Sequence, residues 1–182
     1  IEKAASRPSH IRERDARATG QVPLVIFTAS RGRRHGLESF FTRSKPSLPG
    51  RVLIDDDDEC YQDMVLPEGW EFLSGPPVGS AGALNRGYRA FPDEPWYAVC
   101  SDDVLCEAGW DKVLSEACVP DKVSWGDDGR WGPELCTTFF VGGDLVRKMG
   151  WLAHPDFGHL YIDKIWWEIA YWSEKGSYCQ NV

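Results

Sequence analysis

The sequence predicts a single α/β domain with a mostly parallel β-sheet flanked by helices. Short apolar runs alternate with amphipathic segments along the chain, which is the pattern of a parallel sheet with crossover helices. The 182 residues are enough for one full core and too few for two. With 42% hydrophobic residues, 9 Trp, 8 Phe and 6 Tyr, the composition is that of a folded, aromatic-rich globule.

The strand candidates are short runs rich in β-branched and aromatic residues, each followed by a polar or glycine-containing stretch. We expect strands within residues 22–30, 51–59, 70–77, 96–100, 122–132 and 135–143. Helical spacing of apolar residues predicts helices within residues 37–45, 80–91, 108–119, 144–152 and 161–176. Pro46 and Pro49 stop the first helix, Ser80 is a candidate N-cap of the second, and Gly176 is a C-cap signal for the last.

Charge is distributed unevenly along the chain. Residues 1–51 carry a balance of +7 and residues 52–182 a balance of −15, which together give the net charge of −8. The acidic body argues against a general electrostatic grip on nucleic acid. A basic part facing an acidic remainder suits a site that holds phosphates on one side and a cation on the other. Residues 1–20 alone are equally consistent with a solvated basic tail or a short helix, ahead of a domain at 21–182.

The cysteines favour free thiols. The six cysteines include no CxxC pair, and Cys100 and Cys136 lie in apolar runs, which indicates buried thiols in a reducing, cytoplasmic compartment. Closely spaced Cys or His pairs, which a zinc site needs, are missing. No apolar run approaches the roughly 20 residues that a membrane span requires. The oligomeric state is left open.

Polar residues follow three of the expected strands at the point where each strand ends. They are Ser30–Arg34 after the first, Asp55–Asp58 after the second and Ser101–Asp103 after the fourth. In parallel α/β sheets, ligands bind in the crevice beyond the carboxyl ends of the strands. The sequence therefore predicts one shared site at this edge.

Asp102 and Asp103 end an apolar strand, where an unpaired carboxylate is costly to bury. Alternation along the strand puts Ser101 and Asp103 on one side and Asp102 on the other. Asp103 can then bind a divalent cation directly, while Asp102 reaches a ribose hydroxyl, or the metal through water. Carboxylate oxygens suit Mg²⁺ or Mn²⁺, and such a cation would hold a diphosphate.

The order of elements, with "SDDV" after the fourth strand and "GWDKVL" behind it, resembles the GT-A glycosyltransferases over about residues 22–175. The likeness is to small family-2-like members, including phage and actinobacterial ones, and a virus-encoded protein in a host cytoplasm would fit it. The resemblance implies a Rossmann-type, mostly parallel sheet and metal-dependent transfer of a sugar from a nucleoside-diphosphate sugar. Ser101 departs from the family's DxD motif at the first Asp, whereas Asp103 matches the second, metal-binding Asp.

The resemblance also implies which residues bind the nucleotide sugar. The loop "FTASRGR" would cradle the base, and Asp55 or Asp56 would contact the base or ribose. Asn85 and Arg86 would face the nucleotide sugar, with solvent-facing positions as the alternative. Trp110 and Asp111 would close the pocket, although Trp110 also suits the core. The implied nucleotide-sugar-binding set is Thr28, Ser30, Arg31, Arg33, Asp55, Asp56, Asn85, Arg86, Ser101 and Asp102.

On the acceptor side, the resemblance places Gly142 and Gly143 where backbone approaches a sugar. Family members that invert the anomeric centre place their catalytic Asp or Glu at a helix start, which here makes Asp163 the expected general base. An acid favoured by the helix dipole is the structural alternative for Asp163. His159 would complete the metal site or face the acceptor, or serve only as a structural histidine.

Two other functions remain open at this stage. A sugar nucleotidyltransferase shares this sheet, but its Gly-rich loop after the first strand is missing from "TASRGRRHG". A non-catalytic module that binds a nucleotide or glycan is favoured slightly by Ser101. The acceptor, whether a glycan, a small molecule or a modified DNA base, is not indicated.

Overall fold

The computed structural model describes residues 25–182, so the tail or short helix predicted for residues 1–20 lies outside the described residues. The strands within residues 25–182 form one sheet, in the order β3-β2-β1-β4-β6-β5-β7. Of these strands, β6 alone runs antiparallel to its neighbours. The predicted α/β class with a mostly parallel sheet is confirmed. The strands are β1 (Val25–Ala29), β2 (Gly50–Asp55), β3 (Trp70–Gly75), β4 (Trp96–Val99), β5 (Val123–Gly126), β6 (Phe139–Gly142) and β7 (Gly176–Cys179).

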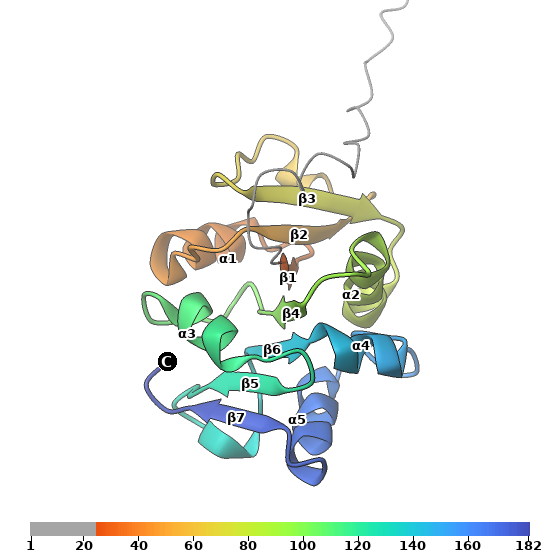
Figure 1. Ribbon diagram of the computed structural model, residues 1–182. Helices are drawn as coiled ribbons and strands as arrows, with labels where there is room; N and C mark the ends of the chain where they lie inside the picture. The colour runs from red at the N-terminus through yellow and green to blue at the C-terminus, as the bar shows by residue number, and fades with distance from the viewer. Residues whose placement is uncertain (1–24) are drawn as a thin grey trace, which may run out of the picture.

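Helices cover both faces of the sheet (Figure 1). One face packs against α2 (Gly79–Ala90), α4 (Gly143–Met149) and α5 (Ile162–Trp172), and the other against α1 (Arg34–Ser39) and α3 (Trp110–Ala117). Helix α1 continues as the π-helix η2 (Phe40–Ser44), and two short 3₁₀ turns, η3 (Glu59–Tyr61) and η4 (Gly132–Glu134), lie in connections.

Alternation of side chains along the strands separates two apolar clusters, one on each face. In β1, Val25 and Phe27 pack in the cluster beneath α2, whereas Ile26 packs with Leu37 and Phe40 on the opposite face. Both faces of β1 are buried, as expected for a central strand of a parallel sheet.

Three details differ from the sequence-based expectation. Helix α5 ends at Trp172, and Gly176 begins the unpredicted strand β7 instead of capping the helix. Ser80 is not an N-cap, because Val78 holds that position and no side chain caps α2. The first helix begins at Arg34, three residues before the expected range.

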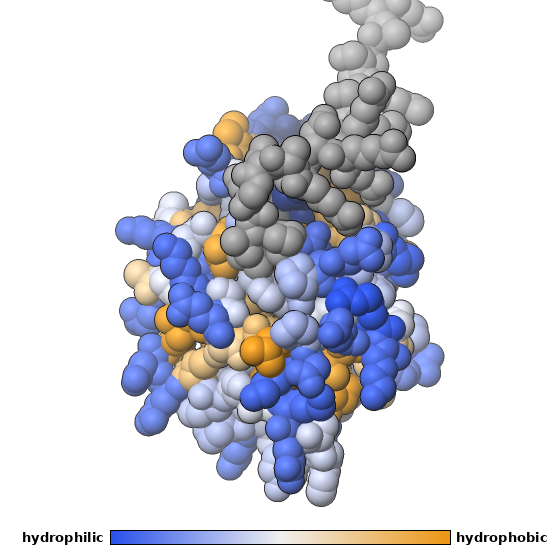
Figure 2. Space-filling model, viewed as in Figure 1, coloured by the Kyte–Doolittle hydropathy of each residue, from blue (hydrophilic) through white to orange (hydrophobic). Residues whose placement is uncertain are grey.

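The six cysteines, all within residues 25–182, are free thiols, as predicted. Within the same residues, none of the helices has the length and apolarity that crossing a bilayer demands. On the face seen in Figure 2, hydrophobic residues form small separate spots among hydrophilic side chains.

Candidate functional site

A cavity of about 620 Å³ opens at the edge of the sheet where β1, β2 and β4 end. The loops after these strands, the first turns of α2 and the segment His159–Asp163 line it, and so does Thr137 ahead of β6. The volume is in the usual range for small-molecule sites. The prediction that polar strand ends meet at one edge agrees with this arrangement.

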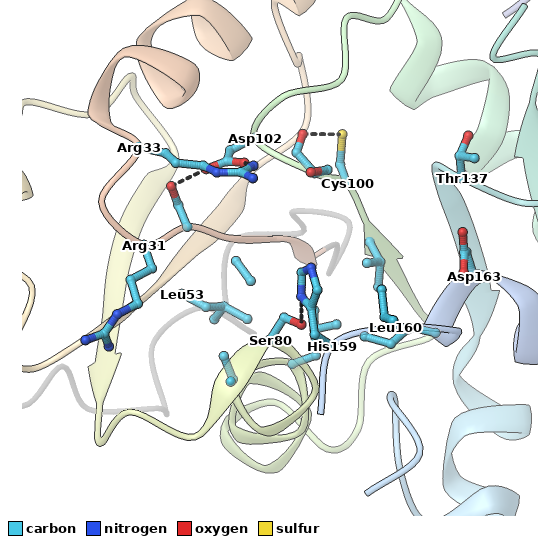
Figure 3. A pocket seen from close by; sticks show the side chains of 18 of the residues that line it. Arg31, Arg33, Leu53, Ser80, Cys100, Asp102, Thr137, His159, Leu160 and Asp163 are labelled. Atoms are coloured by element: carbon cyan, nitrogen blue, oxygen red, sulfur yellow. Dashed lines mark hydrogen bonds and ion pairs between the residues drawn. The ribbon is translucent and has the colours of Figure 1, made fainter. Parts of the chain in front are cut away.

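One wall carries a cluster of opposite charges at the ends of β1 and β4 (Figure 3). Arg33 Nη1 donates to Asp102 Oδ1 at 2.9 Å and to Asp103 Oδ2 at 2.8 Å. Asp102 is buried, with 2% of its surface exposed, and its Oδ2 accepts a hydrogen bond of 2.5 Å from Ser30 Oγ. Asp103 is exposed, and its Oδ1 accepts from Ser101 Oγ. The Ser101 hydrogen bond, together with Arg33, lowers the pKa of the Asp103 carboxyl.

A second charge cluster joins the loop after β1 to the end of β2. Arg31 donates to Asp55 and, at 3.0 Å from each of two nitrogens, to Asp57. These bonds, chiefly those to Asp57, raise the pKa of the Arg31 guanidinium. Asp58 Oδ2 accepts from the Gly32 amide at 2.6 Å. Asp55 and Arg31 line the cavity, whereas Asp57 and Asp58 fix the loop.

Tyr61 is a supporting residue that sequence reasoning missed. Its buried hydroxyl lies 2.6 Å from Ser30 Oγ and accepts a hydrogen bond of 3.1 Å from the Arg33 amide. Burial raises the Tyr61 pKa to about 12. Tyr61 thereby positions the backbone of the loop that carries Arg31 and Arg33. A lone aromatic residue after four aspartates gives no signal of such a role.

Asp163 and Thr137 line the side of the cavity away from Arg33, and His159 lines it beside Ser80 (Figure 3). Asp163, in the first turn of α5, accepts a hydrogen bond of 2.7 Å from the Lys164 amide through Oδ1. Its Oδ2 makes no hydrogen bond to any residue within 25–182. The thiol of Cys136 donates to the Asp163 carbonyl at 2.9 Å and so fixes the start of the helix.

His159 and Tyr161 precede that helix. His159 Nδ1 lies 2.8 Å from Ser80 Oγ, so this histidine joins the start of α2 to the segment before α5. Tyr161 has a φ of +69°, which is a strained conformation for a non-glycine residue. Strain of this kind is found preferentially at functional sites.

The carboxylates of Asp102 and Asp103 fit a hard divalent cation that completes its coordination with phosphate oxygens and water. In the described part of the chain, no three His, Cys, Asp or Glu side chains gather as a complete metal site. His159 is hydrogen-bonded to Ser80, and Asp103 lies outside the cavity lining. Asp103 and His159 thus have different immediate partners in this structure, and their joint role as metal ligands stays a prediction.

Several residues predicted to bind the nucleotide sugar have structural partners instead. Asn85 is buried, and its amide bonds the backbone of Leu152 and Ala153. Arg86 donates to the carbonyls of Ile54 and Pro76. Thr28 is fully buried within β1, and Asp56 is exposed, whereas Asp55 lines the cavity.

The residues predicted to close the pocket or approach the acceptor also lie elsewhere. Trp110 is buried between Phe40 and Phe140, and its Nε1 donates to the Ser44 carbonyl. Asp111 is fully buried and accepts from the amides of Ser47 and Leu48 at 2.5 and 2.7 Å. None of these residues lines the cavity.

Gly142 and Gly143 lie at the far edge of the sheet, because β6 is antiparallel to β4. Gly142 is paired with Trp96, the first residue of β4, whereas the cavity lies beyond the last. A parallel β6 would have brought the two glycines to the cavity. The expectation that they approach the acceptor there does not match this geometry.

No protein-family model matches the chain, and no curated protein matches it in sequence. Among solved structures, the fold is similar to mannosyltransferase PcManGT from Pyrobaculum calidifontis, in complex with GDP-Man and Mn²⁺. The TM-score is 0.63 at 13% identity, and the match covers 90% of this chain and 56% of that one. The chain thus has a glycosyltransferase-like fold and spans little more than half the length of that protein.

Proposed function

We propose that this chain is a glycosyltransferase that moves a sugar from a nucleoside-diphosphate sugar to a hydroxyl acceptor. The observation that carries the proposal is that charged groups suited to two different roles lie on two sides of one cavity. Asp102 and Arg33 line one side, with Asp103 bonded to Arg33 just outside the lining, and the other side holds Asp163 with one carboxylate oxygen free of partners within residues 25–182. The shared fold with a mannosyltransferase in complex with GDP-Man and Mn²⁺ supports it.

The end of β1 and the end of β2 would hold the nucleotide. Arg31 and Arg33 bring positive charge to the cavity, which suits a diphosphate, and Asp55 offers a carboxylate for base or ribose hydrogen bonds. Asp102 and Asp103 would hold Mn²⁺ or Mg²⁺. When bound, that cation would stabilise the charge of the departing nucleoside diphosphate.

Asp163 would act as the general base of an inverting reaction. A carboxylate at this position can take the proton from the attacking acceptor hydroxyl through Oδ2, while the Lys164 amide holds Oδ1. Asp163 lines the cavity on the side away from Asp102, and so it lies across from the proposed diphosphate site. Inversion requires attack from the side opposite the leaving group, which this arrangement suits.

The experiment is a panel of nucleotide sugars, including GDP-mannose and UDP-glucose, incubated with Mn²⁺. Release of the nucleoside diphosphate is measured with water as the acceptor. A nucleotidyltransferase would instead release pyrophosphate from a nucleoside triphosphate and a sugar 1-phosphate, and this reaction is assayed in parallel. Asp163→Asn should lower turnover about 10²- to 10⁴-fold, because an amide cannot accept the proton. Its nucleotide affinity should match that of the parent.

The matched control is Asp144→Asn, which changes another acid in the first turn of a helix, paired with Arg147 and outside the cavity. Its turnover should remain at the parent level. Turnover of Asp163→Asn within about threefold of the parent would rule out Asp163 as the base.

A nucleotide- or glycan-binding module without turnover is the second candidate. It is favoured by the contact of Arg33 with both carboxylates, which leaves no vacant cation site in this conformation. If the chain binds a nucleotide but neither hydrolyses nor transfers the sugar of any member of the panel, it is a binding module and not an enzyme.

A further inference from the structure

All four oxygens of the Asp102 and Asp103 carboxylates have a partner in this structure. Ser30 donates to Asp102 Oδ2, and Ser101 donates to Asp103 Oδ1. Arg33 Nη1 donates to the two remaining oxygens, Asp102 Oδ1 at 2.9 Å and Asp103 Oδ2 at 2.8 Å. A single nitrogen therefore occupies the position between the two carboxylates.

A divalent cation bridging the same carboxylates would need the oxygens that Arg33 now holds. The serine hydroxyls orient the other two oxygens and keep them engaged. A guanidinium and a cation at that point would also repel each other, because two positive charges within about 4 Å interact unfavourably even when partly screened by solvent. The cation and Arg33 therefore compete for this pair of carboxylates.

The backbone and side chain of Arg33 differ in how firmly they are held. The amide is fixed by the Tyr61 hydroxyl at 3.1 Å, so the residue stays beside the cavity. The side chain is 53% exposed and lines the cavity, and its ion pairs are with these two aspartates. Once displaced, its guanidinium can turn into the cavity, where a phosphate is the group that it binds best.

We propose that Arg33 is a phosphate-binding residue held on Asp102 and Asp103 until a divalent cation replaces it. The proposal rests on the proposed function, since it assumes that a nucleoside diphosphate and a cation share this cavity. Its consequence is a coupling between the two ligands: the cation releases Arg33, and released Arg33 strengthens nucleotide binding. Loss of the Arg33 side chain should therefore raise the affinity for the cation and lower the affinity for the nucleotide.

The test measures two affinities of the full chain and of Arg33→Gln. Mn²⁺ alone is titrated by electron paramagnetic resonance, and GDP, UDP, CDP and ADP are titrated by calorimetry at saturating Mn²⁺. Arg33→Gln should bind Mn²⁺ about fivefold more tightly, the factor expected from loss of a partly exposed ion pair. It should bind the preferred nucleotide at least about tenfold more weakly, because a charge-assisted contact is lost.

Two further variants control the test. Arg34→Gln changes the next residue, whose ion pair is with Glu38, and should leave both affinities at the parent values. Arg33→Lys keeps the charge but lacks the planar guanidinium, so both affinities should be intermediate. Circular dichroism verifies that each variant is folded.

The outcomes separate this inference from the proposed function. If Arg33→Gln binds Mn²⁺ no more tightly than the parent, Arg33 does not compete with the cation. If its nucleotide affinity is unchanged, Arg33 is not a phosphate ligand, and either result overturns the inference alone. A parent that binds none of the four nucleotides, with or without Mn²⁺, overturns the proposed function as well.

Discussion

Asn85→Ala should destabilise the fold without acting on the cavity chemistry. The Asn85 amide donates to the Ala153 carbonyl at 2.6 Å and accepts from the Leu152 and Ala153 amides at 2.8 and 3.0 Å. Both partner residues are fully buried, so truncation leaves three backbone groups without a replacement from water. At about 1 kcal/mol for each hydrogen bond, the loss is about 3 kcal/mol. Better helix propensity of alanine offsets about 0.5 kcal/mol of it.

The expected net loss of unfolding free energy is thus about 2–3 kcal/mol, measured by urea denaturation. Arg89→Ala, an exposed position on the same helix, is the control and should change stability by less than about 0.5 kcal/mol. A loss below about 1 kcal/mol for Asn85→Ala would refute the reasoning. It would mean that the Leu152–Ala153 backbone finds other partners.

Two other substitutions test the fold, one at the far edge of the sheet and one beside the cavity. In Gly142→Ala, the new Cβ would lie 2.2 Å from the Pro120 carbonyl oxygen, so urea denaturation should show a loss of about 1–3 kcal/mol, and parent-like stability would contradict the packing. The Tyr61 pKa, raised from 10.0 to about 12, gives stability that is present below pH 10 and is lost as the pH rises to 12. The two pKa units correspond to about 2.7 kcal/mol over the full titration and to about 2 kcal/mol of it between pH 10 and 12. The stability of Tyr61→Phe should therefore fall by about 2 kcal/mol less in that interval, and equal slopes would disprove the shift.

Much of the fold could be predicted because its strands are short apolar runs that end in polar residues. The same feature located the cavity, since the ends of β1, β2 and β4 meet at one edge. Strand direction could not be read in this way. The run that forms β6 looks like any other buried strand, and its reversal moved Gly142 and Gly143 to the far edge. Strand β7 was missed because "GSYC" is short and only half-buried.

The supporting residues were harder to predict than the charged ones. Asn85 and Asp111 have the polar side chains of a binding site, yet both satisfy buried backbone groups. A sequence does not distinguish a polar group that binds a ligand from one that replaces water inside the fold. Tyr61 shows the converse, because an aromatic residue with no motif around it positions the loop of Arg33.

The reversed direction of β6 has a consequence for how this site can vary. Strand β5 ends and β6 begins at the same edge, so the connection of residues 127–138 starts and ends at the edge of the site instead of crossing to the far edge. Thr137 reaches the cavity from this connection, and Trp131 is exposed within it. Insertions or exchanges there would reshape one wall while the ladder between β5 and β6 stays paired. Changes in this connection would therefore alter one wall of the cavity and leave the sheet intact.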